Sequence, residues 1–376
     1  MGKISVLVFG NSFGGRITSS LAEDRSIEVH LLSDEKQDPG RFARCCRSFQ
    51  TFQWSLQPEE LLAKIHGALK RTGCEVLFPT YDRHVRFVSL YREELSQHVI
   101  LCQVPRTEDF DIVNNKWSLH QYLCAHGLPS PNSILIDASG EYIQQAGKMR
   151  FPVLFKMCNA GNALNMKMYK DYESVRSDAD HLLRFAGSGI LQEYIRGSDI
   201  GCSFLCKDGE MVNYTIQASA APRKNPFKTD RVVRFVEDQV THKEVSRLVK
   251  MLNFSGVANL DIRIEDQTGK RMLVDFNARY WGSVCASVSA GVNIPVIACY
   301  TALGLSFARP LQNPIHYIWP VETILRVLRR FSLRHVQRFP LSRSALRFYV
   351  KDPLVYIALL LNRLRKPKSL RPLLFG

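Results

Sequence analysis

The feature that most constrains this chain is a predicted hairpin at residues 257–276. Two runs rich in Val, Ile, Leu and Met flank a polar segment that contains a glycine. This pattern predicts two antiparallel strands joined by a turn. If the turn is centred on Thr268 and the strands contain no bulge, Asp261 lies directly opposite Asp275.

Two aspartates in this position would repel each other, because directly opposed residues have Cβ atoms about 4.5–5.5 Å apart. A divalent cation between the carboxylates removes that cost. The period of two along a strand places Asn277 and Arg279 on the same face as Asp275. These groups are typical of a site for a metal-bound polyphosphate. A solvated hairpin face with ordinary charges is the alternative interpretation.

Residues 1–110 alternate between buried strands and helices. Continuous apolar runs predict strands, and the segments between them have the spacing of helices; the strands are expected at residues 3–10, 27–34, 75–82 and 99–103. Strands that alternate with helices favour a parallel sheet covered on both faces. The fold class expected from this pattern is α/β.

The first strand is followed by a glycine turn, Gly10-x-x-x-Gly14-Gly15. A dinucleotide fingerprint needs a second glycine two residues after the first, and Ser12 occupies that position. A nicotinamide- or flavin-dependent oxidoreductase is therefore one open interpretation. The other is a tight turn that leads into the first helix, beside a substrate pocket at the carboxyl ends of the strands.

The middle of the chain contains two lysines of interest. Lys116 lies in the first turn of a helix expected over residues 111–127. Lys156 lies within the apolar run 151–157, and a lysine in a buried strand needs a partner such as a phosphate oxygen. An edge strand with Lys156 facing water is the alternative. A helix is expected from residue 172 to residue 185.

Composition narrows the function classes. The ten cysteines show no zinc-type C-x-x-C spacing, which favours reduced core thiols in a cytosolic protein. The sequence contains no run of about 20 apolar residues, so no membrane-spanning helix is predicted. The formal charge is +15, and residues 310–376 carry thirteen Lys or Arg against two acids. The basic character therefore belongs to the C-terminal segment.

Five segments, taken in order, resemble the ATP-grasp superfamily. Their arrangement is most similar to the carbamoyl-phosphate-synthase large-subunit-like branch of carboxylate–amine ligases. The resemblance covers about residues 1–310 and rests on NNKWSLHQYLCAHGLPSP, FPVLFK, ILQEYIRGSD, GVANLDIRI and LVDFNARYWGSVCASVSAGVNIP.

The resemblance implies three parts. A Rossmann-like pre-ATP-grasp domain spans residues 1–110. An ATP-grasp domain of two α+β subdomains spans residues 111–310, with a lid subdomain at about 132–190. A basic helical C-terminal extension spans residues 311–376.

The resemblance also implies roles for named residues. Lys116 and Lys156 contact the phosphates of ATP, and Arg279 faces the transferring phosphoryl group or a substrate carboxylate. One or two Mg²⁺ (or Mn²⁺) ions are held by Asp261, Asp275 and Asn277. The nucleoside is held by Gln192, Glu193, Tyr194, Ile195, Asp199 and Leu260, with Glu193 near the adenine amine and Asp199 on the ribose.

The implied reaction is an ATP-dependent ligation. A carboxylate becomes an acylphosphate, an amine then forms an amide, and ADP and phosphate are released. The chain departs from the family pattern at the metal positions, where aspartates replace glutamates, and in the Gly-poor lid turn at residues 159–162. A nucleotide-binding scaffold or sensor with decayed catalysis, at the membrane surface, is the alternative function.

The partners follow from these observations. Small-molecule carboxylate and amine substrates are expected, with Arg223 and Lys224 as further candidate contacts. Nucleic acid is not expected, because aromatic residues are not interleaved with the basic ones. The pattern of segment 311–376 predicts basic amphipathic helices. We expect these helices to pack as a cap on the body of the protein, which is compatible with contact to an anionic membrane. We expect a cytoplasmic protein, peripheral at the inner membrane face, that can form homo-oligomers.

Overall fold

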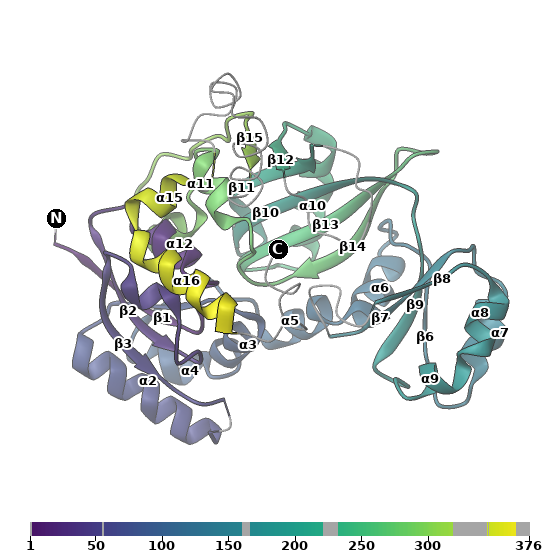
Figure 1. The fold of residues 1–376 in the computed structure, drawn as a ribbon, viewed down its shortest axis with the longest axis horizontal. Helices are drawn as coiled ribbons and strands as arrows, with labels where there is room; N and C mark the ends of the chain where they lie inside the picture. Colours follow the sequence, from purple (N-terminus) through teal and green to yellow (C-terminus); the bar gives the residue numbers. More distant parts are fainter. Residues whose placement is uncertain are drawn as a thin grey trace.

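A computed structural model describes residues 2–54, 56–159, 166–220, 232–318, 344 and 346–365. These residues form three sheets. A parallel sheet lies at one end of the molecule, a six-stranded sheet lies beside it, and a small four-stranded sheet lies at the far end (Figure 1). The lid turn at residues 160–162, the candidates Arg223 and Lys224, and the first C-terminal helix expected from the sequence lie outside the described residues.

The N-terminal sheet is parallel, with the strand order β3-β2-β1-β4-β5. Its strands are β1 (Ile4–Phe9), β2 (Ile27–Ser33), β3 (Cys46–Thr51), β4 (Val76–Pro79) and β5 (Ile100–Leu101). Its helices are α1 (Arg16–Leu21), η1 (Pro39–Phe42), α2 (Pro58–Thr72), α3 (Asp82–Leu90) and α4 (Arg92–Ser96). Strand β3 was not predicted, because this edge strand is only half-buried and lacks an apolar run.

Both faces of this sheet are covered, as the alternation of strands and helices predicts. Leu7 and Phe9 pack with α2 on one face. Val6 and Val8 point to the other face and pack with α1, α11 (Val284–Ser289) and α12 (Ile294–Ala302). Because α11 and α12 also pack under the six-stranded sheet, the two large sheets share one core.

Helices α5 (Thr107–Asn114) and α6 (Lys116–Ala125) lead to the rest of the chain. The single helix expected over residues 111–127 is wrong. Asn115 adopts an extended backbone, and its side chain accepts hydrogen bonds from the amides of Trp117 and Ser118, so that it ends one helix and caps the next.

The small sheet has the order β6-β9-β7-β8. Its strands are β6 (Ser133–Leu135), β7 (Val153–Met157), β8 (Lys167–Tyr169) and β9 (Gly189–Glu193), and its helices are α7 (Glu141–Ala146), α8 (Tyr172–Ser177) and α9 (Ala179–Leu183). The helix expected over 172–185 is interrupted at Asp178. This sheet and its helices have a separate apolar core.

The six-stranded sheet has the order β14-β13-β10-β11-β12-β15. Its strands are β10 (Gly197–Lys207), β11 (Glu210–Ser219), β12 (Val232–Phe235), β13 (Gly256–Glu265), β14 (Arg271–Asn277) and β15 (His316–Ile318), and α10 (Gln239–Met251) packs on it. Helices α15 (Leu346–Lys351) and α16 (Pro353–Arg365) follow and lie against the N-terminal sheet (Figure 1).

Two expectations from composition can be compared with the structure. All ten cysteines are free and eight of them are buried, as expected for core thiols. Within the described ranges, no helix has both the length and the apolar content that crossing a bilayer requires.

Candidate functional site

The predicted hairpin is present as β13 and β14, and it brings two aspartates together. Asp261 pairs with Asp275 in the antiparallel register, as predicted. The assumption of a regular hairpin was wrong, because the register shifts by one residue between Asp261 and Ile262. The bulge adds one residue to β14, and this extra residue restores the pairing of the two aspartates.

Asparagine side chains surround Asp261. Asn259 Nδ2 donates to Asp261 Oδ1 at 3.1 Å, and Asn277 Nδ2 lies 3.3 Å from Asp261 Oδ2. The amide oxygen of Asn277 accepts from Arg279 at 3.1 Å. To bind a cation beside Asp261, Asn277 would need its amide oxygen where its NH2 group now lies. This rotation exchanges an oxygen and an NH2 group of nearly the same shape.

The electrostatics of Asp261 fit a cation. Removal of water by the surrounding protein, together with the charge of Asp275, raises the pKa of Asp261 to about 6, although part of the residue stays exposed. Within the described part of the chain, no three His, Cys, Asp or Glu residues converge on a metal position. Two carboxylates and an amide suit Mg²⁺, which takes its remaining ligands from water and substrate phosphates.

Lys116 begins helix α6 and faces the hairpin. Its backbone amide donates to the carbonyl of Cys158 at 3.0 Å, which ties the helix to the end of β7. Its Nζ lies 3.3 Å from Asp275 Oδ1, and its side chain is largely buried. The predicted phosphate ligand Lys116 is therefore a direct neighbour of the predicted metal ligand Asp275.

Lys156 lies in β7, which is an inner strand between β8 and β9. The alternative of an edge strand with a solvated lysine is therefore wrong. Nζ donates to Gln192 Oε1 at 2.6 Å. Burial lowers the pKa of Lys156 to about 8, while the carboxylates of Asp275 and Asp261 act to raise it. This buried cation faces the same aspartates from a different sheet.

The segment at residues 193–199 connects the two antiparallel sheets. The carboxylate of Glu193 accepts hydrogen bonds from Asn132 Nδ2 at 3.0 Å and from the amide of Arg150 at 2.8 Å. Asp199 Oδ1 accepts from Arg263 at 2.6 Å. Leu260 is fully buried within β13.

Arg263 was missed by sequence reasoning. Its guanidinium donates to Asp199, to the carbonyl of Ile195 and to the hydroxyl of Tyr194, and it stacks on the Tyr194 ring. It therefore fixes three of the six residues predicted to hold the nucleoside. The period of two along β13, which places Arg263 two residues after Asp261, was the available signal.

Arg279 and Asp82 form a second charged pair at the site. Arg279 Nε donates to Asp82 Oδ2 at 3.0 Å, and its guanidinium lies over the rings of Tyr81 and Phe13. Burial raises the pKa of Asp82 against the opposing charge of Arg279. Oδ1 of Asp82 is buried and has no hydrogen-bond partner among the described residues. Asp82 was missed; the only signal was its place at the carboxyl end of a predicted strand.

In the part of the chain that the structure describes, the glycine turn after β1 has no comparable arrangement of charges. Ser12 is fully buried and is bonded to Asp38. A Cβ atom on Gly15 would lie 2.0 Å from Val355, and one on Gly14 would lie 3.0 Å from Leu359. These glycines therefore accommodate helix α16, and the dinucleotide interpretation has no space at this turn.

The family described as "ATP-grasp in the biosynthetic pathway with Ter operon" matches residues 188–323. That span contains the connecting segment, the hairpin and Arg279. The D-aspartate ligase of Enterococcus faecium (strain Aus0004) is 20% identical over 232 residues, which cover 57% of this chain and 55% of that protein. The chain spans about half or less of the length of the curated relatives it matches.

Solved structures show the same fold. The L-amino acid ligase from Bacillus licheniformis gives a TM-score of 0.63 at 17% identity, covering 80% of this chain and 74% of that one. The biotin carboxylase domain of the Hydrogenobacter thermophilus 2-oxoglutarate carboxylase, in complex with MgADP, ADP and bicarbonate, gives 0.64 at 15% identity, covering 84% and 72%.

Proposed function

We propose that this chain, a member of the ATP-grasp superfamily, is an ATP-dependent ligase that activates a carboxylate as an acylphosphate and joins it to an amine. The observation that carries the proposal is the convergence of Lys116 and Lys156, from α6 and β7, on the aspartates of the β13–β14 hairpin. Three segments far apart in the sequence supply these charges. Each charged group is costly to desolvate, so the stability of the fold alone does not explain why these groups are gathered here.

The nucleotide would lie between the small sheet, which would form the lid at about residues 132–190, and the six-stranded sheet. Asp261, Asp275 and Asn277 would hold one or two magnesium ions, and Lys116 and Lys156 would neutralise the phosphates. Mg-ATP supplies the γ-phosphoryl group and the ADP leaving group. A nearby polyanion favours the charged form of Lys156, whose pKa is otherwise lowered by burial.

The nucleoside would lie along residues 192–199. Backbone groups from Gln192 to Ile195 would face the adenine, and Asp199 would accept hydrogen bonds from the ribose hydroxyls. Arg263 bonds both Ile195 and Asp199, which keeps this segment in one conformation before the nucleotide arrives. Preorganisation of this kind lowers the entropic cost of binding.

The acceptor site would lie where Arg279 meets Asp82. Arg279 would orient the substrate carboxylate towards the γ-phosphate. Oδ1 of Asp82, which is buried and has no partner within the described ranges, would accept a hydrogen bond from an ammonium group. A carboxylate that also carries an amine, as amino acids do, offers both groups. Amino acids are also the substrates named for the similar D-aspartate ligase and L-amino acid ligase.

The chemistry can be tested before the amine is known. Hydroxylamine attacks an acylphosphate at its carbonyl carbon, releases phosphate and leaves a hydroxamate that iron(III) colours. We expect hydroxamate from the full chain with Mg-ATP and at least one acid from a panel of amino acids and sugar acids. The Lys156→Met variant should lose the product, and Lys167→Met, which changes an exposed lysine on the neighbouring strand, should keep it.

Two results would overturn the proposal. Hydroxamate formation by Lys156→Met at the wild-type rate would remove the assigned site. Stabilisation by nucleotide without hydroxamate or phosphate release from any acid would instead support a nucleotide-binding scaffold whose catalysis has decayed.

A further inference from the structure

Helices α15 and α16 have an inner face that packs on the N-terminal sheet. Phe348, Val355 and Tyr356 are buried in the core that also contains α1 and α12. Val355 lies against Gly15, and Leu359 lies against Gly14. The inner face of α15 and α16 is therefore packed against the rest of the protein, as a cap would be.

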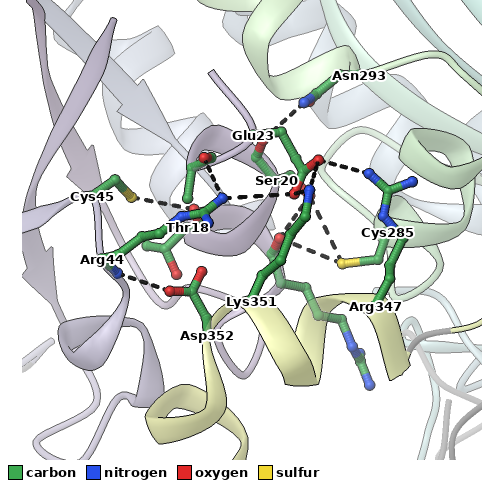
Figure 2. Close-up of polar contacts among 12 residues, drawn as sticks. Thr18, Ser20, Glu23, Arg44, Cys45, Cys285, Asn293, Arg347, Lys351 and Asp352 are labelled. Atoms are coloured by element: carbon green, nitrogen blue, oxygen red, sulfur yellow. Dashed lines mark hydrogen bonds and ion pairs between the residues drawn. The ribbon is translucent and has the colours of Figure 1, made fainter. Parts of the chain in front are cut away.

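Polar contacts fix the orientation of these helices (Figure 2). Glu23, at the end of α1, accepts from Arg347 at 2.6 Å and from Lys351 at 2.7 Å. Burial opposes ionisation, but these two cations hold the pKa of Glu23 below its usual value. The amide of Arg44 donates to Asp352 at 3.0 Å. The ion pairs of Glu23 and the buried apolar side chains together determine which side of α15 and α16 faces outward.

The outer face is apolar and exposed. Five large apolar side chains here are between 47% and 75% exposed. Val350 lies on α15, and Leu354, Ile357, Leu360 and Leu361 follow helical spacing on α16. The described ranges contain twelve exposed large apolar residues, and five of them lie between residues 350 and 361. Next to α16, η1 adds exposed Phe42 with the guanidinium of Arg41 stacked on its ring. We call this set the outer apolar face.

The sequence charge of the segment that contains α15 and α16 indicates what covers this face. The segment 310–376 carries thirteen Lys or Arg and only two acids, one of which is the buried Asp352. Residues 363–376 contain five basic residues and no acid. A second copy on this face would bring two strongly basic segments together, and like charges oppose such contact. An anionic lipid surface offers an apolar layer and the complementary charge.

We propose that the outer apolar face docks on an anionic membrane surface, with α15 and α16 lying in the plane of the headgroups. Exposed apolar side chains would enter the acyl boundary, and basic residues of the same C-terminal segment would contact acidic headgroups. The inner face of α16 covers Gly14 and Gly15, next to Phe13 and the Arg279 pair. Docking would therefore hold the proposed acceptor site close to the bilayer. The inference does not depend on the proposed ligase activity.

The test is co-sedimentation of the full chain with vesicles of phosphatidylcholine alone or mixed with phosphatidylserine. We expect binding to the mixed vesicles, weaker binding to the neutral ones, and a loss of binding as salt is raised. The double variant Ile357→Glu/Leu361→Glu should bind at least about tenfold more weakly. The control is Leu90→Glu/Val240→Glu, which places the same charges on equally exposed apolar residues elsewhere and should bind as wild type does.

Each other outcome counts against the inference. Equal weakening in both double variants would mean that net charge, rather than this face, governs binding. No sedimentation of wild type with phosphatidylserine vesicles would contradict it outright. If wild type is a dimer in solution and Ile357→Glu/Leu361→Glu is a monomer, a second copy covers the face instead. Circular dichroism of the variants verifies that they are folded.

Discussion

The β13–β14 hairpin and the Gly10–Gly15 turn each carry a pattern associated with nucleotide sites, yet they differ in what surrounds them. The hairpin presents Asp261 and Asp275 to two lysines from other segments. The turn presents Gly14 and Gly15 to Leu359 and Val355 of α16. The comparison teaches that a ligand site is marked by charged side chains that converge from distant segments, whereas a glycine pattern alone can serve packing.

The largest expected effect comes from removing a proposed metal ligand on the hairpin. Asp275→Ala should lower ATP turnover by at least about a thousandfold, because magnesium contributes several kcal/mol of charge stabilisation in the transition state. The measurement is phosphate release with a substrate found by the hydroxamate screen. Asp266→Ala, in the turn of the same hairpin, is the control and should stay near wild type. Normal turnover in Asp275→Ala would refute the metal site.

A smaller effect is expected at the acceptor pair. Asp82→Asn should raise the KM for the substrate by roughly ten- to a hundredfold, since a lost charged hydrogen bond costs about 1.5–3 kcal/mol. The affinity for nucleotide should change by less than about threefold. Asp111→Asn removes an exposed aspartate from an Asp–Arg pair and is the matched control. A change in nucleotide affinity with no change in KM would show that Asp82 acts on the phosphate side.

The buried lysine should appear in the pH dependence of stability. The pKa of Lys156 is about 8 in the folded protein against a usual 10.5, so between these values only the unfolded chain holds the proton. Stability therefore rises with pH in this window. The free energy of unfolding of nucleotide-free wild type, relative to Lys156→Met, should rise by on the order of 2 kcal/mol from pH 8 to pH 10. A constant difference in urea unfolding would contradict a buried, perturbed lysine.

The glycine turn should have the smallest effect on turnover. Gly15→Ala should destabilise the protein by about 1–3 kcal/mol, because the new methyl meets Val355 and the backbone φ is positive. Nucleotide affinity and turnover of the remaining folded enzyme should be unchanged. Gly15→Ala/Val355→Ala should recover part of the stability. A specific loss of nucleotide binding in Gly15→Ala would show that this turn contributes to a ligand site.

Much of the fold could be predicted because its signals are local. The buried strands of the N-terminal sheet are continuous apolar runs, and the hairpin carries its own turn. Predictions failed where tertiary contacts decide. The edge strand β3 has no apolar run, and the breaks at Asn115 and Asp178 depend on side chains that cap the following turn or bond a neighbouring strand.

The candidate site shows the same difference between local sequence signals, which could be read, and tertiary contacts, which could not. The pairing of Asp261 with Asp275 follows from the period of two and the turn, although a bulge rather than a regular ladder produces it. Asp82 could not be assigned, because its partner Arg279 is 197 residues away and follows β14 of the six-stranded sheet. Arg263 was visible in the strand, but its role depends on the segment that passes beside β13.

The most direct test of the central claim is calorimetric titration of a non-hydrolysable ATP analogue into the full chain, with magnesium and with a chelator. The account predicts micromolar binding that weakens at least about tenfold without magnesium. In Asp261→Asn/Asp275→Asn, binding should be equally weak with or without the ion. Affinity that is independent of magnesium in wild type, or retained in the double variant, would show that the β13–β14 hairpin does not hold a metal nucleotide.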